Sequence, residues 1–383
     1  MGKRELLLIV AFIVLGTVVY QVTASPSDPN RASWSFAGMI QKMRREVSGN
    51  RASAKTKTTE TVAAPDSLRE LRIVMRTGAI TVIGEDREDV AITMNITSTG
   101  YDSAEAERLA KATALKLDQA GALLIVSVDY PVEGRQTSTL DIRVPRRLVL
   151  RVDEKSGILT AKDIAGVVLG AARGETNISG IDGLVQVTQR GGVISVSDVE
   201  TLRLNTFSGA EARIARVRGA ATFTLQRGEL RAEEVNGAIE LESTNADVRL
   251  EKLEKNRNPL RLNVTNGEIV LEGVQTETRI DARDADIRVD QPRAAPLSIY
   301  NDGDESIELT VPADGFKIDA ISAEGRLTAD AALESAGLKI VESGSDGDAT
   351  AARHEFRANA AMRGGGPTIT LRATRGDIVL RSR

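Results

Sequence analysis

The sequence predicts an all-β protein, a parallel β-solenoid with about 18 residues and two strands per coil, preceded by a small α/β N-terminal cap. First, when every ninth residue from Gly174 to Ala246 is taken, six of the nine residues are glycine and two are alanine. Second, aliphatic residues recur at the same places about every 18 residues. Third, the chain is 41% hydrophobic but only 3% aromatic, which suits regular stacking of aliphatic side chains.

Composition narrows the possible functions. The 383 residues include 50 basic and 54 acidic ones, for a formal net charge of −4. No basic field of the kind that binds nucleic acid is present, so we exclude that class of partner. The chain has no cysteine, which excludes disulfides, thiolate metal sites and cysteine nucleophiles.

The N-terminal segment is charge-free from Leu6 to Ser27. About 20 apolar residues can span a bilayer, whereas Val22-Thr23-Ala24 fits a signal-peptide cleavage site. Residues 1–24 are therefore predicted to be either a transmembrane anchor, which would make the membrane a partner, or a signal peptide. We expect a single-pass protein of the cell membrane with an extracytoplasmic domain, or a secreted or periplasmic protein if the segment is cleaved.

Residues 25–66 are rich in Ser, Thr, Pro, Ala and Lys, and are predicted to form a linker. Within it, SWSFAGMIQKMRREVSG places Phe36, Met39 and Ile40 on one helical face with basic residues opposite. Two interpretations of this short amphipathic helix stay open. It lies on anionic lipid, or it is a tether helix that packs on itself or on nothing.

Residues 67–147 are predicted to form the α/β cap. Ile80 and Val82 alternate with other residues as half-buried strands do, and the alternation returns from Val90 to Ile96. Asp102 and Glu105 have capping-box spacing, which predicts the start of a helix of about three turns. The stretch ALLIVSVDYP then returns to strand. Such a unit would cover the apolar end of the first coil.

The solenoid repeats are predicted over residues 148–290. Each repeat is counted from a glycine or alanine that we call its origin. The origins are Gly157, Gly174, Gly192, Ala210, Gly228, Ala246, Gly267 and Ala285, and successive origins are 17, 18, 18, 18, 18, 21 and 18 residues apart. Aliphatic residues recur two, four and seven places after the origins, and a second set precedes most origins by seven and five. Residues two places apart lie on the same side of a strand, so one side of each predicted strand faces inward. Each coil therefore holds two strands, and neighbouring coils supply the core.

The outward positions of the repeats are predicted to form columns of charge. Acidic residues stand one and five places after the origins, and arginines stand three places after. The candidate binding surface consists of Glu211, Glu229, Asp247 and Glu268 with Arg213, Arg231, Arg249 and Arg288. Members of a column would lie about 4.8 Å apart. The surface either binds a protein or glycan ligand, or only keeps a flat sheet soluble.

The repeat degrades in residues 291–383, which are predicted to be a degenerate solenoid with a C-terminal cap. Residues 342–366 are polar and are predicted to be an insertion. The closing stretch GPTITLRATRGDIVLRSR has the pattern of one more two-strand unit. We therefore expect a pair of strands, rather than a helix, to cap this end.

The sequence shows no pattern of catalytic or metal-binding residues. The single histidine, His354, lies in the polar insertion, and no nucleophile elbow, phosphate loop, zinc-protease or dinucleotide motif is present. The acidic stretches 301–305 and 344–348 lack the spacing of a calcium loop. We therefore expect a protein that is not an enzyme and that has no cofactor or metal site.

Five kinds of stretch carry a family resemblance over about residues 70–383: MRTGAITVIGEDREDVAITM near the start, GGVISVSDV, GELRAEEVNGAIELES and NGEIVLEGV in the repeats, and TRGDIVL at the end. They resemble the bacterial "putative adhesin" domain, a family of unknown function. The resemblance implies a β-solenoid, often behind a single N-terminal membrane segment. It brings no established functional residues to this chain.

The expected function is a non-enzymatic bacterial cell-envelope solenoid that presents an adhesin-like binding surface outside the membrane. One alternative is an envelope scaffold or signalling partner that binds another protein. A second alternative is a carbohydrate-active β-helix enzyme. That enzyme would need carboxylates and basic residues clustered in a concave site, whereas the charge columns are regular along the array.

Overall fold

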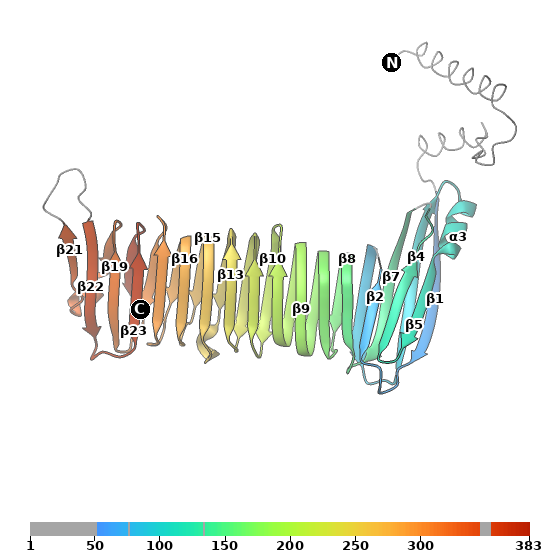
Figure 1. Ribbon diagram of the computed structural model, residues 1–383, viewed down its shortest axis with the longest axis horizontal. Coiled ribbons are helices and arrows are strands. Elements are labelled where there is room, and N and C mark those ends of the chain that lie inside the picture. Colours follow the sequence, from blue (N-terminus) through green and yellow to red (C-terminus); the bar gives the residue numbers. More distant parts are fainter. Residues whose placement is uncertain (1–51, 76, 133–134, 345–353) are drawn as a thin grey trace, which may run out of the picture. The chain divides into compact units, whose positions relative to one another are not determined.

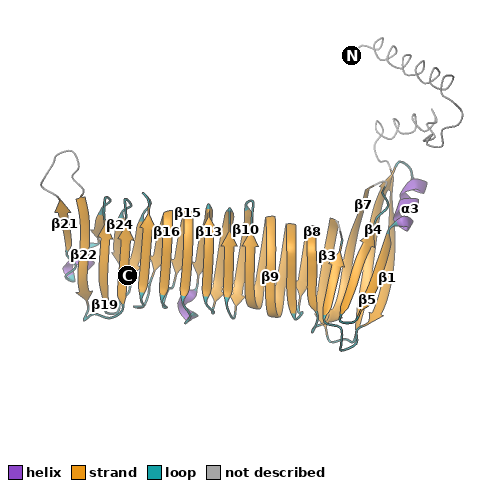
Figure 2. Ribbon diagram, in the orientation of Figure 1, coloured by secondary structure: helices purple, strands orange, loops and turns teal. Residues whose placement is uncertain are grey.

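The computed structural model describes residues 52–75, 77–132, 135–344 and 354–383. Residues 53–383 form one unit built almost wholly of strands (Figures 1 and 2). The predicted anchor or signal at 1–24 and the predicted amphipathic helix lie outside the described residues. Within the described ranges, no helix combines the length and the apolar character that crossing a membrane requires.

The repeats form a parallel solenoid with two strands per coil, as predicted. On one face, β10 (Ala210–Val217), β12 (Gly228–Val235) and β14 (Ala246–Glu251) pair in parallel, with each residue beside the one 18 places later. On the other face, β11 (Ala221–Leu225) and β13 (Ile239–Thr244) pair in the same way. We call these the β10 face and the β11 face.

Further strands extend the array in both directions. They are β8 (Val149–Lys162), β9 (Gly166–Thr206), β15 (Leu260–Glu272), β16 (Thr278–Asp290), β17 (Leu297–Asp302) and β18 (Ile307–Val311). β15 and β16 each continue from one face of the coil to the other. Two stretches of β15, Leu260–Thr265 and Gly267–Glu272, pair with β16 in the same register. A 3₁₀ turn, η1 (Leu253–Lys255), occupies the enlarged loop after β14.

The inward aliphatic columns are buried. Ile178, Val196, Ile214 and Leu250 expose at most 2% of their surface, and Ile214 lies beside Val196 of the preceding coil. Complete burial of such a side chain contributes about 1.5–3 kcal/mol. Because each coil leaves its aliphatic row uncovered above and below, this stabilisation depends on the neighbouring coils.

The regular glycines mark the corners of the coil. Gly228 has a φ of 120°, and a Cβ there would lie 2.1 Å from the carbonyl oxygen of Ala210 in the preceding coil. Both φ and space therefore exclude a side chain. Where the origin is Ala246, the residue before it, Asn245, takes the positive φ instead, at 53°. At the opposite corner, a Cβ on Gly237 would meet the backbone of the preceding coil at 2.1 Å.

The last inward position before the β10-face corner is often polar. Buried polar residues there are Lys155, Gln189, Thr206, Ser243, Asn301 and Ser322. The Gln189 amide donates to the carbonyl oxygens of Gly174 and Gly191 at 3.0 and 2.8 Å, and the Asn301 amide donates to that of Ala285 at 2.9 Å. These side chains provide partners for buried carbonyl groups at the corner.

Lys155 is the charged member of this row and is only 1% exposed. Its Nζ donates to the carbonyl oxygens of Gly78 and Ser156, each at 2.5 Å. Burial lowers the pKa of the Lys155 ammonium to about 8. Since Gly78 belongs to the N-terminal cap, Lys155 links the cap to the first coil of the array.

The N-terminal cap contains more strand than predicted. β1 (Ala52–Ala63) falls within residues 25–66, which were expected to be linker, and pairs with β4 (Asp89–Gly100). The linker prediction is therefore wrong at its C-terminal end. The segment is polar in composition, but its side chains alternate between the two sides of a strand, and Ala54 and Val62 pack against the core.

The predicted helix is α3 (Ser103–Ala112). The Asp102 carboxylate accepts from the Glu105 amide at 2.8 Å, and the Glu105 carboxylate accepts from the Tyr101 amide at 2.7 Å. The first bond is the N-cap bond of a capping box, and the second reaches back to the residue before the N-cap. After the helix, β5 (Ala114–Ala120) turns back antiparallel to β6 (Leu123–Asp129).

The coils at this end do not stack in chain order. β2 (Glu70–Val74) and β3 (Thr77–Glu85) form a coil that pairs in parallel with β8 on one side. On the other side, β2 pairs with β6 and β3 pairs with β7 (Arg135–Pro145). The earliest coil of the chain thus lies between a later coil and the array, and β4 pairs antiparallel with β7 beyond it.

The C-terminal end is interleaved in the same way. β23 (Thr368–Ala373) lies between β17 and β19 (Phe316–Ser322), and β24 (Ile378–Ser382) lies between β18 and β20 (Leu327–Ala329). The pair expected to cap the array is therefore inside it. Ile378 and Leu380 are fully buried because coils cover them on both sides.

The strands beyond β19 come from the predicted polar insertion at 342–366. β22 (His354–Met362) pairs antiparallel with β19, and β21 (Ile340–Gly344) pairs antiparallel with β22. A short helix, α4 (Ala331–Ser335), precedes them and buries Leu333. The expectation of an insertion is therefore wrong for 354–362, where Ala358 and Met362 face the core.

Candidate functional site

The predicted charge columns form on the β10 face. The register stacks Glu211, Glu229 and Asp247 in one column and Arg213, Arg231 and Arg249 in the next. Glu268 and Arg288 continue the two columns on β15 and β16. Val270 interrupts the arginine column, since it lies between Arg249 and Arg288.

The four arginines of these columns pair with carboxylates of the same face. Arg288 pairs with Glu268 at 2.6 Å, and Arg249 pairs with Glu272 at 2.6 Å and also with Glu251. The arginine side chains stay about half exposed, and exposed ion pairs each contribute about 0–1 kcal/mol. We call the ion-paired region from β12 to β16 the charge lattice.

Glu251 is the most buried carboxylate of the charge lattice, with 7% of the residue exposed. Burial by itself would raise the pKa of Glu251. Hydrogen bonds from Arg231, at 2.9 Å, and from Arg249 outweigh this effect and hold the pKa below its usual value. Glu251 therefore stays ionised and joins two arginines of successive coils.

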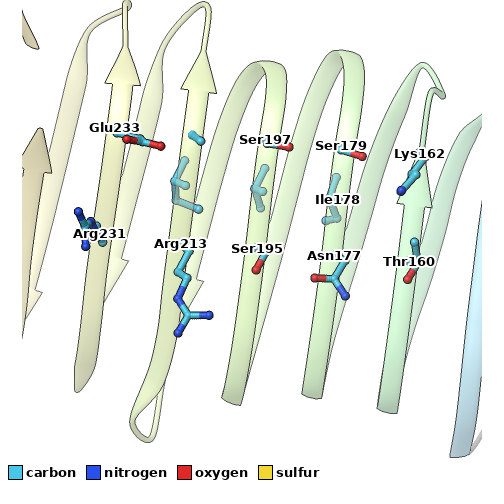
Figure 3. Close-up of a pocket in the computed structure, with 13 residues that line it drawn as sticks. Thr160, Lys162, Asn177, Ile178, Ser179, Ser195, Ser197, Arg213, Arg231 and Glu233 are labelled. Carbon is cyan, nitrogen blue, oxygen red and sulfur yellow. The ribbon is translucent and has the colours of Figure 1, made fainter. Parts of the chain in front are cut away.

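A shallow trough lies on the same face, runs N-terminally from the charge lattice and shares β12 with it (Figure 3). It offers about 720 Å³ of accessible space and spans five coils. Its two rows of outward residues are Thr160, Asn177, Ser195, Arg213 and Arg231, and Lys162, Ser179, Ser197, Ala215 and Glu233. Ile178, Val196 and Ile214 also line it, and because their side chains are buried in the core, their main chain forms the floor.

The two ends of the trough are cationic. Lys162 stands at one end and Arg213 and Arg231 at the other, with Glu233 as the one carboxylate among the lining residues. Three cations and one carboxylate give the lining a formal charge of +2. Arg213 and Arg231 pair with Glu211 and Glu251, which lie outside the lining, so among the described residues it is Lys162 that distinguishes the trough from the charge lattice.

Lys162 is the cation of the trough that no carboxylate neutralises among the described residues. Arg231 pairs with Glu251 at 2.9 Å, and Glu233 pairs with Lys252 at 2.5 Å. The side chain of Lys162 is exposed and projects beside short neighbours, Thr160 and Ser179. An anionic ligand would find this charge free to interact.

Of the predicted surface residues, Arg213 and Arg231 alone line the trough. Charge patterns do not predict the other lining residues Thr160, Asn177 and Ser195, which occupy the same outward position as the arginines. A signal was present in the sequence, because the arginine and glutamate pattern gives way to short polar residues before Ala210. Short side chains between longer ones leave a hollow on a flat sheet.

The other residues singled out in the sequence have structural surroundings. His354 is exposed, and its Nδ1 lies 2.8 Å from the Glu342 carboxylate. Asn301, in the acidic stretch 301–305, is buried and donates to the backbone. In the part of the chain that the structure describes, no group of three or more His, Cys, Asp or Glu residues could hold a metal ion.

Stacked two-strand coils, an aliphatic interior and a polar outer face define a parallel β-solenoid protein. The chain belongs to the Toastrack DUF4097 family, whose model matches residues 68–381. The resemblance seen in the sequence, to an adhesin domain of unknown function, is thereby confirmed. The comparison with curated proteins finds no match.

Solved structures with similarity to the chain include three bacterial proteins. A "putative cell adhesion protein" from Clostridium sporogenes is 9% identical, with 86% of this chain and 100% of that chain covered and a TM-score of 0.20. A "putative adhesin" from Parabacteroides distasonis is 11% identical, with 67% and 97% covered and a TM-score of 0.38. A "putative adhesin" from Parabacteroides merdae is 11% identical, with the same coverage and a TM-score of 0.25.

Proposed function

We propose that the protein is a non-enzymatic, adhesin-like binding protein of the bacterial cell envelope, which presents the β10 face of its solenoid outside the membrane. The observation that carries this proposal is the trough, a hollow in which polar side chains stand beside the main-chain floor and cations stand at both ends. Parallel strands hold its lining residues in register. Little conformational entropy is then lost when a ligand binds, because the surface is already ordered.

The lining of the trough favours binding over glycoside hydrolysis. Hydrolysis of this kind uses two carboxyl groups about 5–9.5 Å apart. Glu233 is the one carboxylate that lines the trough, and it pairs with Lys252 at 2.5 Å. The groups that remain are hydroxyls, an amide and cations, which can hold a ligand but do not form an acid and base pair.

The proposed location is supported by the charge-free segment from Leu6 to Ser27. A cleaved signal exports the chain that follows it, and an anchor does so when its N-terminal end, with Lys3 and Arg4, stays in the cytoplasm. Absence of cysteine is compatible with an extracytoplasmic compartment. The solenoid would then meet ligands at the cell surface or in the periplasm.

Binding without turnover is tested with the full-length protein and a panel of acidic and neutral polysaccharides. Retention of polysaccharide is measured together with the release of reducing ends and unsaturated products. We expect retention with no new products. Clear turnover would overturn the proposal in favour of a carbohydrate-active enzyme.

The location is tested by adding protease to intact cells and following the solenoid with an antibody. We expect digestion of the solenoid while a cytoplasmic marker stays intact. Protection of the solenoid in cells whose outer layers are permeable to the protease would overturn the extracytoplasmic assignment.

A further inference from the structure

We infer that the trough binds a linear anionic polysaccharide that runs along the solenoid axis. Its acidic groups are held by Lys162 at one end and by Arg213 and Arg231 at the other, and its hydroxyls meet the polar rows between them. This inference rests on the proposed binding function and names its class of ligand.

The length and repetition of the trough fit a polymer. Five outward positions, from Thr160 to Arg231, lie on successive coils. Parallel strands are about 4.8 Å apart, so the four spacings cover about 19 Å. Each coil presents two outward side chains at the same spacing, short and polar in the middle and charged towards the ends. A long ligand can meet side chains of every coil, whereas a compact ligand would contact only part of the row.

The groups between the cations fit sugar hydroxyls. Asn177 contributes an amide, and Thr160, Ser179, Ser195 and Ser197 contribute hydroxyls. Hydroxyl groups donate and accept hydrogen bonds, and an amide offers both roles at separate atoms. No aromatic ring and no exposed apolar side chain from the described residues lines the trough. Stacked bases or an apolar peptide would therefore lack their preferred contacts.

The electrostatics favour an anionic ligand. The lining has a formal charge of +2, and Lys162 has no ion-pair partner among the described residues. Two carboxylates flank the trough and are engaged: Glu175 accepts from the Asn177 amide at 2.7 Å, and Glu211 pairs with Arg213. These contacts reduce the repulsion that an acidic sugar would meet. Binding through exposed cations should weaken as salt rises.

The test compares charged polymers with neutral polymers of the same backbone. Full-length protein is titrated with polygalacturonate and with its fully methyl-esterified form, and with dextran sulfate and dextran, by isothermal titration calorimetry. We expect at least one charged polymer to bind at least tenfold more tightly than its neutral counterpart, with affinity falling as salt is added. Equal binding of both members of each pair would overturn the anionic class and leave the proposed binding function standing.

Matched variants place the ligand in the trough. Lys162→Gln should weaken binding about tenfold, a loss of about 1.4 kcal/mol. Arg288→Gln removes the same charge from the same face outside the trough and should leave affinity unchanged. Ala215→Glu extends the acidic column of Glu233 into the trough and should weaken binding at least tenfold. Circular dichroism and urea midpoints check that each variant is folded.

The outcomes separate the inference from the function on which it rests. Equal losses in Lys162→Gln and Arg288→Gln would assign binding to overall charge and overturn the trough as the site. No binding of any of the four polymers would overturn the polysaccharide inference. In that case, retention of the wild-type chain on isolated cell envelopes, lost in Ala215→Glu, would uphold a binding function with a protein ligand, whereas no retention would overturn both.

Discussion

The coils beneath the trough and the coils beneath the charge lattice share one interior but differ on their outer face. Ile178 and Val196 under the trough and Leu250 under the charge lattice are equally buried. Outside, the first region has Asn177, Ser195 and Lys162, which has no ion-pair partner in the part of the chain that the structure describes. The second region has arginines bound to carboxylates.

The difference shows that stacking and surface chemistry are independent in this fold. Inward residues make the contacts between coils, so outward residues can change from one coil to the next without disturbing the core. Paired charges keep the sheet soluble. Short polar side chains leave space for a ligand. A binding site can therefore arise where the regular charge pattern stops.

The largest expected effect tests whether the interior is the same in both regions. Ile178→Ala and Leu250→Ala should each lower the free energy of unfolding by about 3 kcal/mol, because each opens a cavity in a stacked column. Urea denaturation followed by circular dichroism measures the loss. A much smaller loss for Ile178→Ala than for Leu250→Ala would show that the core beneath the trough is looser and would break the comparison.

The next effect concerns the polar row inside the corner, where Lys155 near the trough corresponds to Gln189 further along. The pKa of Lys155 is about 8 in the fold, because burial lowers it from the ordinary lysine value of 10.5. The unfolded chain therefore binds more protons between these values, and stability should rise with pH across that window. Lys155→Gln keeps a donor and removes the charge, so it should be about 2 kcal/mol more stable at pH 7.

This prediction is checked by urea unfolding of both proteins from pH 7 to pH 10.5. The advantage of Lys155→Gln should shrink as pH rises, since the wild-type amine becomes neutral in both states. Lys162→Gln, an exposed lysine of the same strand, serves as the control and should show no such pH-dependent difference. A constant difference between Lys155→Gln and wild type would contradict the buried charge.

A smaller effect is expected in the charge lattice. Glu251→Gln should lower the free energy of unfolding by about 1–2 kcal/mol at pH 7, because two arginine bonds to a buried carboxylate are weakened. The pKa of Glu251 is below the ordinary glutamate value of 4.5. Its contribution is therefore present above pH 4.5 and is lost as pH falls through the lower, folded value.

The smallest effect is that of the exposed carboxylate in the same column. Glu272→Gln should change stability by less than about 0.5 kcal/mol, since its ion pair with Arg249 is exposed to solvent. Thermal unfolding of both variants at pH 7 gives the comparison. Equal losses for Glu251→Gln and Glu272→Gln would show that burial does not distinguish the two sites.

The sequence predicted the solenoid well where the repeat is regular. Gly228 and Gly267 mark corners, and the aliphatic residues after them alternate with a period that only a strand with one inward side explains. The same 18-residue spacing predicted the charge columns. Periodicity succeeds because one physical constraint, burial between coils, acts again on every coil.

The ends of the array and the trough could not be obtained in this way. A sequence period relates each coil to the next coil along the chain. It therefore does not predict the pairing of β24 with β18, which are separated by about 70 residues. β1 was hidden by its lysines and threonines. The trough depends on which side chains are short relative to their neighbours, as at Ser195 beside Arg213, and charge patterns do not show this difference.

The interleaved C-terminal coil constrains how the protein is made. β17 and β18 lie on one side of β23 and β24, and β19 and β20 lie on the other. Translation produces these last two strands after both of their neighbours. A chain made only as far as β20 therefore lacks the coil that separates β17 and β18 from β19 and β20. Removal of β23 and β24 would thus take away an internal layer of the array rather than a loose tail.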